Sequence, residues 1–217
     1  GFSESMNSHA MKNSEWAVVS YLSQSRYGKL GNENFTGANK EVYQNKSNQY
    51  ITGCSYGSPS NGNTDYGCQY TYDNNIRTED GMTGKGVGAS TTGTIYGVYD
   101  MSGGTWEYVM GNYNDISASS GFSEPLTLES KYYDKYTSNN MSLACNGSEC
   151  LSHGLSETVG WYNDYRAMVS EEYPWLLRSG GYDHGNIAGV FYFSASSHLG
   201  GPSIGNSFRL VMSVTSP

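Results

Sequence analysis

The chain has 217 residues, of which 36% are hydrophobic and 15% are charged, and both fractions are low for a cytosolic enzyme. A formal net charge of -8 without any basic cluster excludes nucleic acid and anionic membrane surfaces as expected partners. Apolar runs stay shorter than the ~18 residues that a membrane span needs. With 28 Gly and 20 Tyr among many Ser and Asn, we expect one loop-rich domain over residues 1–217, of a composition that suits a binding surface.

The first predicted element in chain order is a helix over residues 11–27, which Asn13 or Ser14 can cap and Gly28 can end. The spacing of its apolar residues predicts one apolar face, made of Trp16, Val19 and Leu22. Residues 95–99 form a short, β-prone segment after a long polar stretch.

The second half of the chain carries more strand signals. Residues 106–110 are apolar, and residues 112–149 are polar and predict an irregular insertion. A second helix over residues 157–172 would share one face among Trp161, Tyr165, Met168 and Val169. The predicted strands are residues 175–178, 189–193 and 208–214. Short strands and two helices in one domain indicate an α+β fold with long loops.

Four cysteines occur, at Cys54, Cys68, Cys145 and Cys150, and their spacing suggests two local pairs. Three pairings remain open, because spacing alone does not choose among them. Zinc is the competing interpretation, but neither pair is a Cys-x-x-Cys and His153 is the only imidazole nearby. Disulfides are favoured and imply an oxidising setting. We therefore expect an extracellular or cell-surface protein, or one displayed on a virion, with any anchor upstream of this sequence.

A recognisable signature covers residues 97–109, which read Gly-Val-Tyr-Asp-Met-Ser-Gly-Gly-Thr-Trp-Glu-Tyr-Val. It resembles the Gly-(Leu/Val)-Tyr-Asp-Met-x-Gly-Asn-x-Trp-Glu-Trp motif of the formylglycine-generating-enzyme (sulfatase-modifying factor) family, with Gly104 in place of Asn and Tyr108 in place of Trp. Residues 177–181 are similar to that family's Arg-Gly-Gly-Ser-Trp strand, and residues 206–211 to its closing Gly-Phe-Arg-Leu. The ordered matches imply the family's fold, which is a variant of the C-type lectin fold.

Within this resemblance the matched residues suit structural roles. The expected core anchors are Trp106, Trp175 and Phe208. Buried or half-buried pairs that fix the loops are expected to involve Arg178, Arg209, Asp100 and Glu107. The family's enzymes use two cysteines near the C-terminal end for copper-dependent oxidation, whereas no cysteine follows Cys150 here. We therefore expect the fold to carry over without the activity, so that the protein is not an enzyme.

Residues 176–211 contain no Lys, Glu, Gln, Met or Trp, although these five types make up 35 of the 217 residues. The longest comparable gap elsewhere covers only residues 50–68. The same five amino acids cannot arise when the adenines of an Asn codon are randomised. The pattern resembles the variable proteins of diversity-generating retroelements, which use a related C-type-lectin-like fold and vary near the C-terminus. The alternative is that a Gly- and Ser-rich strand region lacks these residues by chance.

This resemblance implies a variable ligand-binding region over residues 176–211, held by fixed residues at 188–193 and 207–210. The expected variable positions, converging on one solvent-facing surface, are Tyr182, Asp183, His184, Asn186, Ile187, Ser194, Ser196, Ser197, His198, Leu199, Pro202, Ser203 and Ile204. Large side chains dominate binding hot spots, so the main contacts are expected from Tyr182, His184, His198 and Leu199.

No cofactor is expected. Two imidazoles and a carboxylate at His184, His198 and Asp183 are types that hold a metal, but no spacing motif supports a metal site. Structural calcium stays open, because Asp- and Asn-rich loops bind it in many lectin-like folds. The favoured function is a diversified module that binds a protein or a glycan at a cell surface. The alternatives are an invariant adhesin or pilus-associated domain and, third, a formylglycine-type oxidase.

Overall fold

The computed structural model describes residues 6–28, 42, 90–94, 96–99, 101–138, 158–181, 184 and 187–214. Within these ranges the fold is α+β and mostly sheet, as the sequence predicts, but it has one α-helix rather than two. The elements in chain order are β1 (Met6–Ala10), α1 (Asn13–Ser23), β2 (Trp106–Tyr113), β3 (Asp134–Tyr136), β4 (Trp175–Arg178), β5 (Phe193–Ala195), β6 (Asn206–Phe208) and β7 (Leu210–Val214). Single 3-10 turns lie at Ser130–Tyr132 and Trp161–Asn163.

Strand β2 is the centre of the larger sheet, whose order is β3-β2-β4-β5. β4 pairs with it antiparallel along one edge, with Glu107 opposite Arg178. β3 and β6 run parallel to different halves of β2, β6 alongside residues 106–108 and β3 alongside residues 111–113. Side chains alternate along β2, so that Val109 points into the core and Trp106 lies half-buried on the opposite side.

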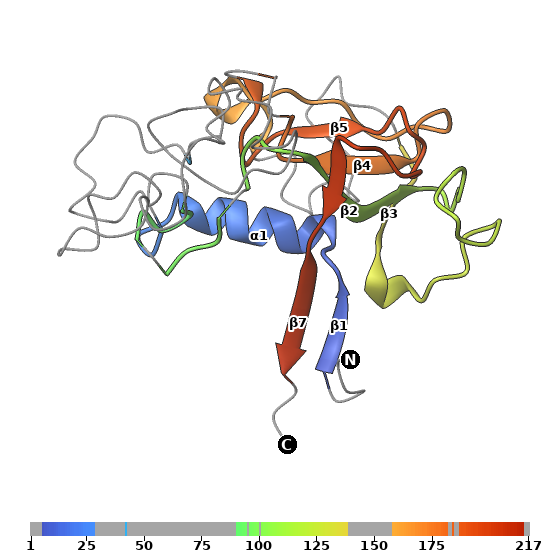
Figure 1. Ribbon diagram of the computed structural model, residues 1–217, viewed down its shortest axis with the longest axis horizontal. Helices are drawn as coiled ribbons and strands as arrows, with labels where there is room; N and C mark the ends of the chain where they lie inside the picture. Colours follow the sequence, from blue (N-terminus) through green and yellow to red (C-terminus); the bar gives the residue numbers. More distant parts are fainter. Residues whose placement is uncertain are drawn as a thin grey trace.

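Strands β1 and β7 form a separate two-stranded ribbon, with Met6 opposite Val214 and Ala10 opposite Leu210. The ribbon extends away from the larger sheet and brings the two ends of the chain side by side (Figure 1). The sheet strand β5 lies at the other end of the molecule from these termini (Figure 1).

One hydrophobic core joins α1 to the larger sheet. Trp16 of α1 is fully buried, and its indole N–H donates to the carbonyl of Val190 (2.8 Å). The core residues packed together are Met11, Trp16, Val42, Met101, Val109, Tyr136, Met168, Val169, Leu176, Val190, Phe191 and Phe193. Three of these lie within residues 190–193, so the core is built in part from residues 176–211.

Helix α1 is shorter than the predicted helix over residues 11–27, and its cap is not the expected one. Lys12 is the N-cap residue, so the prediction of Asn13 or Ser14 as cap is wrong. The free N–H of Ser14 instead donates to the carboxylate of Asp134 in β3 (2.6 Å). A carboxylate from a distant strand thus accepts a hydrogen bond from the helix N-terminus, where a neighbouring side chain was expected to do so.

The helix also ends before Gly28, at Ser23, and serine hydroxyls in its last turns donate to backbone carbonyls. Ser20 donates to the carbonyl of Trp16 (2.9 Å), and Ser23 donates to that of Ser20 (2.6 Å). The predicted apolar face holds for Trp16, which is buried, and in part for Val19, which is half-buried against the core, whereas Leu22 is exposed. The buried side of the helix consists of Asn13, Trp16, Ser20 and Ser23.

The predicted second helix over residues 157–172 does not continue through its described part, because no α-helix follows Thr158. Two internal bonds close only a 3-10 turn at Trp161–Asn163, and further on the backbone bonds to residues 187 and 193. Tyr165 N–H donates to the carbonyl of Ile187 (3.0 Å), and Ala167 N–H to that of Phe193 (2.9 Å). Trp161 and Tyr165 are therefore exposed while Met168 is buried, so the expected common face is wrong.

Two further predicted strands, residues 189–193 and 208–214, do not form as expected. Residues 189–192 form a turn, and Phe191 N–H donates to the buried carboxylate of Asp164 (3.0 Å). A Cβ on Gly189 would lie 2.2 Å from that carboxylate, so only glycine fits. The predicted strand over residues 208–214 is interrupted at Arg209, where the chain passes from β6 to β7 and from one sheet to the other.

The first predicted strand and the predicted insertion are also corrected. Residues 96–99 form a turn and an irregular segment, because Val98 N–H donates to the hydroxyl of Thr91 (3.0 Å) rather than to a strand. Residues 112–138, predicted to be irregular, include the end of β2 and all of β3. Strand β4 is confirmed over Trp175–Arg178. Within the described ranges, no helix is long and apolar enough to cross a membrane.

Candidate ligand-binding pocket

A pocket of about 400 Å³ lies between β2, β4, β5 and the loops around residues 165 and 184. Its volume falls in the range of small-ligand sites. The residues that line it are Trp106, Tyr165, Leu177, His184, Ile187, Tyr192, Ser194, Ala195, Ser197, His198 and Asn206. Among these residues none is an Asp, Glu, Lys, Arg or Cys, so the pocket is formed by aromatic, aliphatic and neutral polar groups.

Four rings form one wall of the pocket. His184 lies edge-on to Trp106, with ring centroids 5.0 Å apart and planes at 77°, and 5.6 Å from Tyr192. Tyr165 follows at 5.7 Å from Tyr192, and the indole N–H of Trp106 donates to the Tyr192 hydroxyl (3.3 Å). The rings are tilted relative to one another, so they surround a volume instead of stacking into a solid core.

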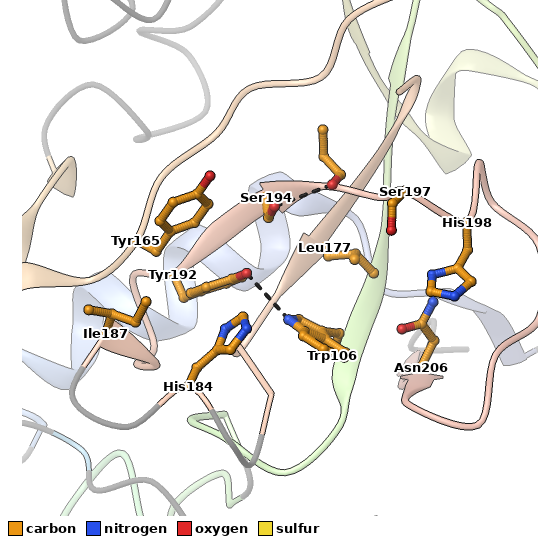
Figure 2. A pocket seen from close by; sticks show the side chains of 11 residues that line it. Trp106, Tyr165, Leu177, His184, Ile187, Tyr192, Ser194, Ser197, His198 and Asn206 are labelled. Atoms are coloured by element: carbon orange, nitrogen blue, oxygen red, sulfur yellow. Dashed lines mark hydrogen bonds between the residues drawn. The ribbon is translucent and has the colours of Figure 1, made fainter. Parts of the chain in front are cut away.

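The opposite wall is polar. Figure 2 shows Tyr165, Ile187 and Tyr192 on one side of the pocket, and Ser197, His198 and Asn206 on the other. Leu177 and Trp106 lie between these two groups (Figure 2). The lining of the pocket is therefore aromatic and apolar on one side and polar on the other.

Several polar atoms of the lining are buried without a partner. They are Nδ1 of His184 and both amide atoms, Oδ1 and Nδ2, of Asn206. A buried donor or acceptor left unpaired costs about 1–3 kcal/mol, so native proteins keep few of them. Unpaired atoms in the wall of a pocket are the pattern expected of a site whose hydrogen bonds are completed by a ligand.

Five of the expected variable residues come together in this pocket: His184, Ile187, Ser194, Ser197 and His198. Three more are exposed or half-buried beside the same segment, namely Pro202, Ser203 and Ile204. Leu199 is half-buried outside the lining, and its carbonyl accepts the N–H of Ser119 (2.9 Å). Tyr182, Asp183 and Asn186 lie outside the described residues, as do the four cysteines and Asp100.

Ser196 corrects the expected set. Its side chain is fully buried, and its hydroxyl lies 2.7 Å from that of Tyr108. The Ser196 hydroxyl also accepts the N–H of His198 (3.2 Å), so it fixes the backbone of the turn. Ser196 is thus a framework residue, and its neighbour Ser197 is exposed. Successive side chains point to opposite sides of an extended chain, so directly after β5 one of these two serines points inward and the other toward solvent.

Sequence reasoning missed half of the pocket. Trp106 was expected only as a core anchor, yet it is half-buried and lines the pocket. Tyr165 was assigned to a helix face, and Leu177, Tyr192, Ala195 and Asn206 were assigned no binding role. No local pattern links residues 106 and 165 to residues 176–211, because only the tertiary fold brings them together. Asn206 alone had a signal, being an Asn within residues 176–211.

Where the structure describes them, the charged residues that the sequence predicts to form pairs do not line the pocket but fix the strands that carry it. Glu107 of β2 forms a two-pronged ion pair with Arg209, which also donates to the carbonyl of Tyr99 (3.2 Å). Arg178 of β4 is fully buried, and burial lowers its pKa to about 10. Trp175 is confirmed as a core anchor, but Phe208 is not, because its ring is 63% exposed on β6.

Arg178 holds three backbone or side-chain acceptors at once. Its Nε donates to Oδ1 of Asn13 (2.7 Å), and Nη1 to the carbonyls of Tyr192 (3.3 Å) and Phe191 (3.5 Å). One side chain therefore ties α1, β4 and the turn that carries Tyr192 into the pocket wall.

The described ranges contain no group of three or more His, Cys, Asp or Glu side chains that could hold a metal ion. Comparisons of the chain with protein-family models, with curated proteins and with solved structures find no match. The functional interpretation therefore rests on the sequence pattern and on the geometry of the pocket.

Proposed function

We propose that this protein is a surface-displayed ligand-binding domain whose residues 176–211 are diversified by a retroelement. The observation that carries the proposal is the clustering of His184, Ile187, Ser194 and His198, with Ser197, around one pocket. The codon pattern that marks these residues contains no information about their positions in space. They line one cavity together with Trp106 of β2 and Tyr165, which lie far from them in the sequence.

The pattern of burial in the same segment supports the proposal. Ala188, Val190, Phe191 and Phe193 are buried in or beside the core, and they hold the backbone between the pocket residues. A diversified segment needs such an arrangement, because random substitutions are tolerated only where side chains leave the core unchanged. Binding loops on a rigid scaffold follow the same rule.

A C-type-lectin-like fold of the formylglycine-generating-enzyme type remains part of the proposal. The three segments that resemble the family's motifs meet on β2, since β4 carries residues 177–178 and β6 carries residues 206–208. The Glu107–Arg209 ion pair joins the first motif segment to the last. These contacts between segments that resemble the family's motifs support the proposed fold.

We place the protein outside the cell or on a virion, where a protein or glycan ligand would be bound without chemical change. The net charge of -8 argues against a nucleic-acid partner, because phosphate contacts need clustered cations. The pocket suits recognition, since neutral polar groups and aromatic rings surround a volume large enough for one ligand group.

The test is to sequence the DNA that flanks the gene in its source. The proposal predicts a near-copy of the segment that encodes residues 176–211, with Asn codons at positions 184, 194, 197 and 198, next to a reverse-transcriptase gene. Codon 196 is the matched control, and we expect no randomised adenine there because the Ser196 side chain is buried. Flanking DNA without any such copy would refute diversification and leave an invariant adhesin as the better function.

A further inference from the structure

We infer that the pocket receives a tyrosine side chain presented by a protein ligand. The inference rests on the proposed function as a binding site and specifies the group that is bound. Its basis is the division of the lining into residues inside and outside the expected variable set. Those outside it, Trp106, Tyr165, Leu177 and Tyr192, supply most of the aromatic and aliphatic wall.

Trp106 and Tyr165 lie outside residues 176–211, and Tyr192 belongs to the expected fixed residues 188–193, so on the proposed function every variant would offer the same three rings. The rings of Trp106, Tyr165 and Tyr192 are tilted around the cavity, which favours edge-to-face contacts with an inserted aromatic ring. A sugar ring prefers one flat aromatic face together with several charged or amide hydrogen-bonding groups. Here no charged side chain lies among the lining residues, and only Asn206 supplies an amide.

The bound side chain also needs a polar end. The wall opposite the rings holds Ser197, His198 and Asn206 (Figure 2). In this wall both amide atoms of Asn206 are without a partner. A phenol hydroxyl can donate and accept hydrogen bonds, so it suits a wall with one unpaired donor and one unpaired acceptor. A tyrosine side chain matches this lining better than an aliphatic or an indole group does.

Two levels of recognition follow. The fixed wall selects an aromatic anchor that different ligands share, and the variable residues select the surroundings of that anchor. Tyrosine is among the residues that most often anchor protein interfaces, so many target proteins present one.

The experiment is a titration of the whole domain with N-acetyl-L-tyrosinamide, followed by the NMR signal of the Trp106 indole N–H. A Trp106→Phe variant assigns that signal among the four tryptophans. We expect saturable shifts of this signal, with a dissociation constant on the order of millimolar for so small a probe. N-acetyl-L-leucinamide and methyl α-D-glucopyranoside serve as comparison probes and are expected to shift it far less.

A matched pair of variants tests the site. Tyr165→Ala removes an exposed ring of the pocket wall and should weaken binding of the tyrosinamide roughly threefold to tenfold. Tyr165→Phe keeps the ring and should bind like the parent. Tyr96→Ala removes a tyrosine that is 86% exposed and outside this pocket, and it should change nothing.

Saturable binding of the glucoside in preference to the tyrosinamide, or no binding of either, would overturn the inference. Equal loss in Tyr165→Ala and Tyr96→Ala would do the same. None of these outcomes affects the template copy in the flanking DNA, so failure of the tyrosine inference stays distinguishable from failure of the proposed function.

Discussion

Residues 176–211 contain two interleaved sets that differ in what surrounds them. One set, which includes Val190, Phe191 and Phe193, is buried among core side chains. The other, which includes Ser194, Ser197 and His198, borders the pocket. Ser196 and Ser197 are neighbours in sequence, yet the first is fully buried and the second is exposed. The comparison teaches that stability and recognition are separated one side chain at a time, within a single segment.

The largest expected effect comes from the buried side of this comparison. Arg178→Met should lower the free energy of unfolding by about 3 kcal/mol or more, because Asn13 and two carbonyls lose their donor inside the core. Urea unfolding followed by tryptophan fluorescence measures the change. Arg166→Met replaces an exposed arginine and should stay within about 0.5 kcal/mol of the parent. Similar losses in both variants would show that Arg178 does not tie the pocket wall to α1.

A pair of identical substitutions sharpens the comparison further. Ser196→Tyr should destabilise the protein by about 1–3 kcal/mol, because a ring cannot enter the closed space beside Tyr108 without displacing it. Ser197→Tyr places the same ring on the surface and should stay within about 0.5 kcal/mol. Thermal unfolding of the two variants side by side gives the answer. A tolerated tyrosine at position 196 would return that residue to the variable set.

The pocket side of the comparison should tolerate several changes at once. Replacing Ser194, Ser197 and His198 together by Asn should alter the free energy of unfolding by no more than about 1 kcal/mol, since none of the three is buried in the core. Denaturant unfolding of the triple variant measures this value. A loss well above that value would mean that the pocket residues also carry the fold, which a diversified surface could not allow.

The smallest effect concerns Asp115, which follows β2 and does not line the pocket. Asp115 accepts hydrogen bonds from Lys135 and Tyr133, and these lower the pKa of its carboxyl below the ordinary 3.8. A lowered pKa in the folded state adds stability that is present above pH 3.8 and is lost as the pH falls through the lower folded value. Asp115→Asn should cost less than about 1 kcal/mol at neutral pH.

The measurement for Asp115 is the difference in unfolding free energy between the parent and the Asn variant across pH. This difference should be constant at neutral pH and should shrink in acid, as the parent carboxyl becomes protonated. A difference that grows on acidification would contradict the assigned cause of the pKa shift.

The sequence alone predicted the α+β class, the strand β4, the buried Trp16 and the existence of a helix near residue 13. These features depend on local periodicity and on large apolar side chains, which few arrangements can bury. Codon chemistry in residues 176–211 further identified five of the residues that line the pocket. Both kinds of signal are written along the chain and need no knowledge of distant contacts.

The tertiary structure alone decided the rest. Residues 165–167 bond to residues 187 and 193 instead of forming a helix, and Asp134 caps a helix that begins more than one hundred residues earlier. Trp106 and Tyr165 line the pocket from outside residues 176–211. Each of these outcomes is a long-range hydrogen bond or ring contact whose partner lies far along the chain. Local propensity is weak compared with such contacts, because burial leaves every backbone and aromatic polar group in need of a specific partner.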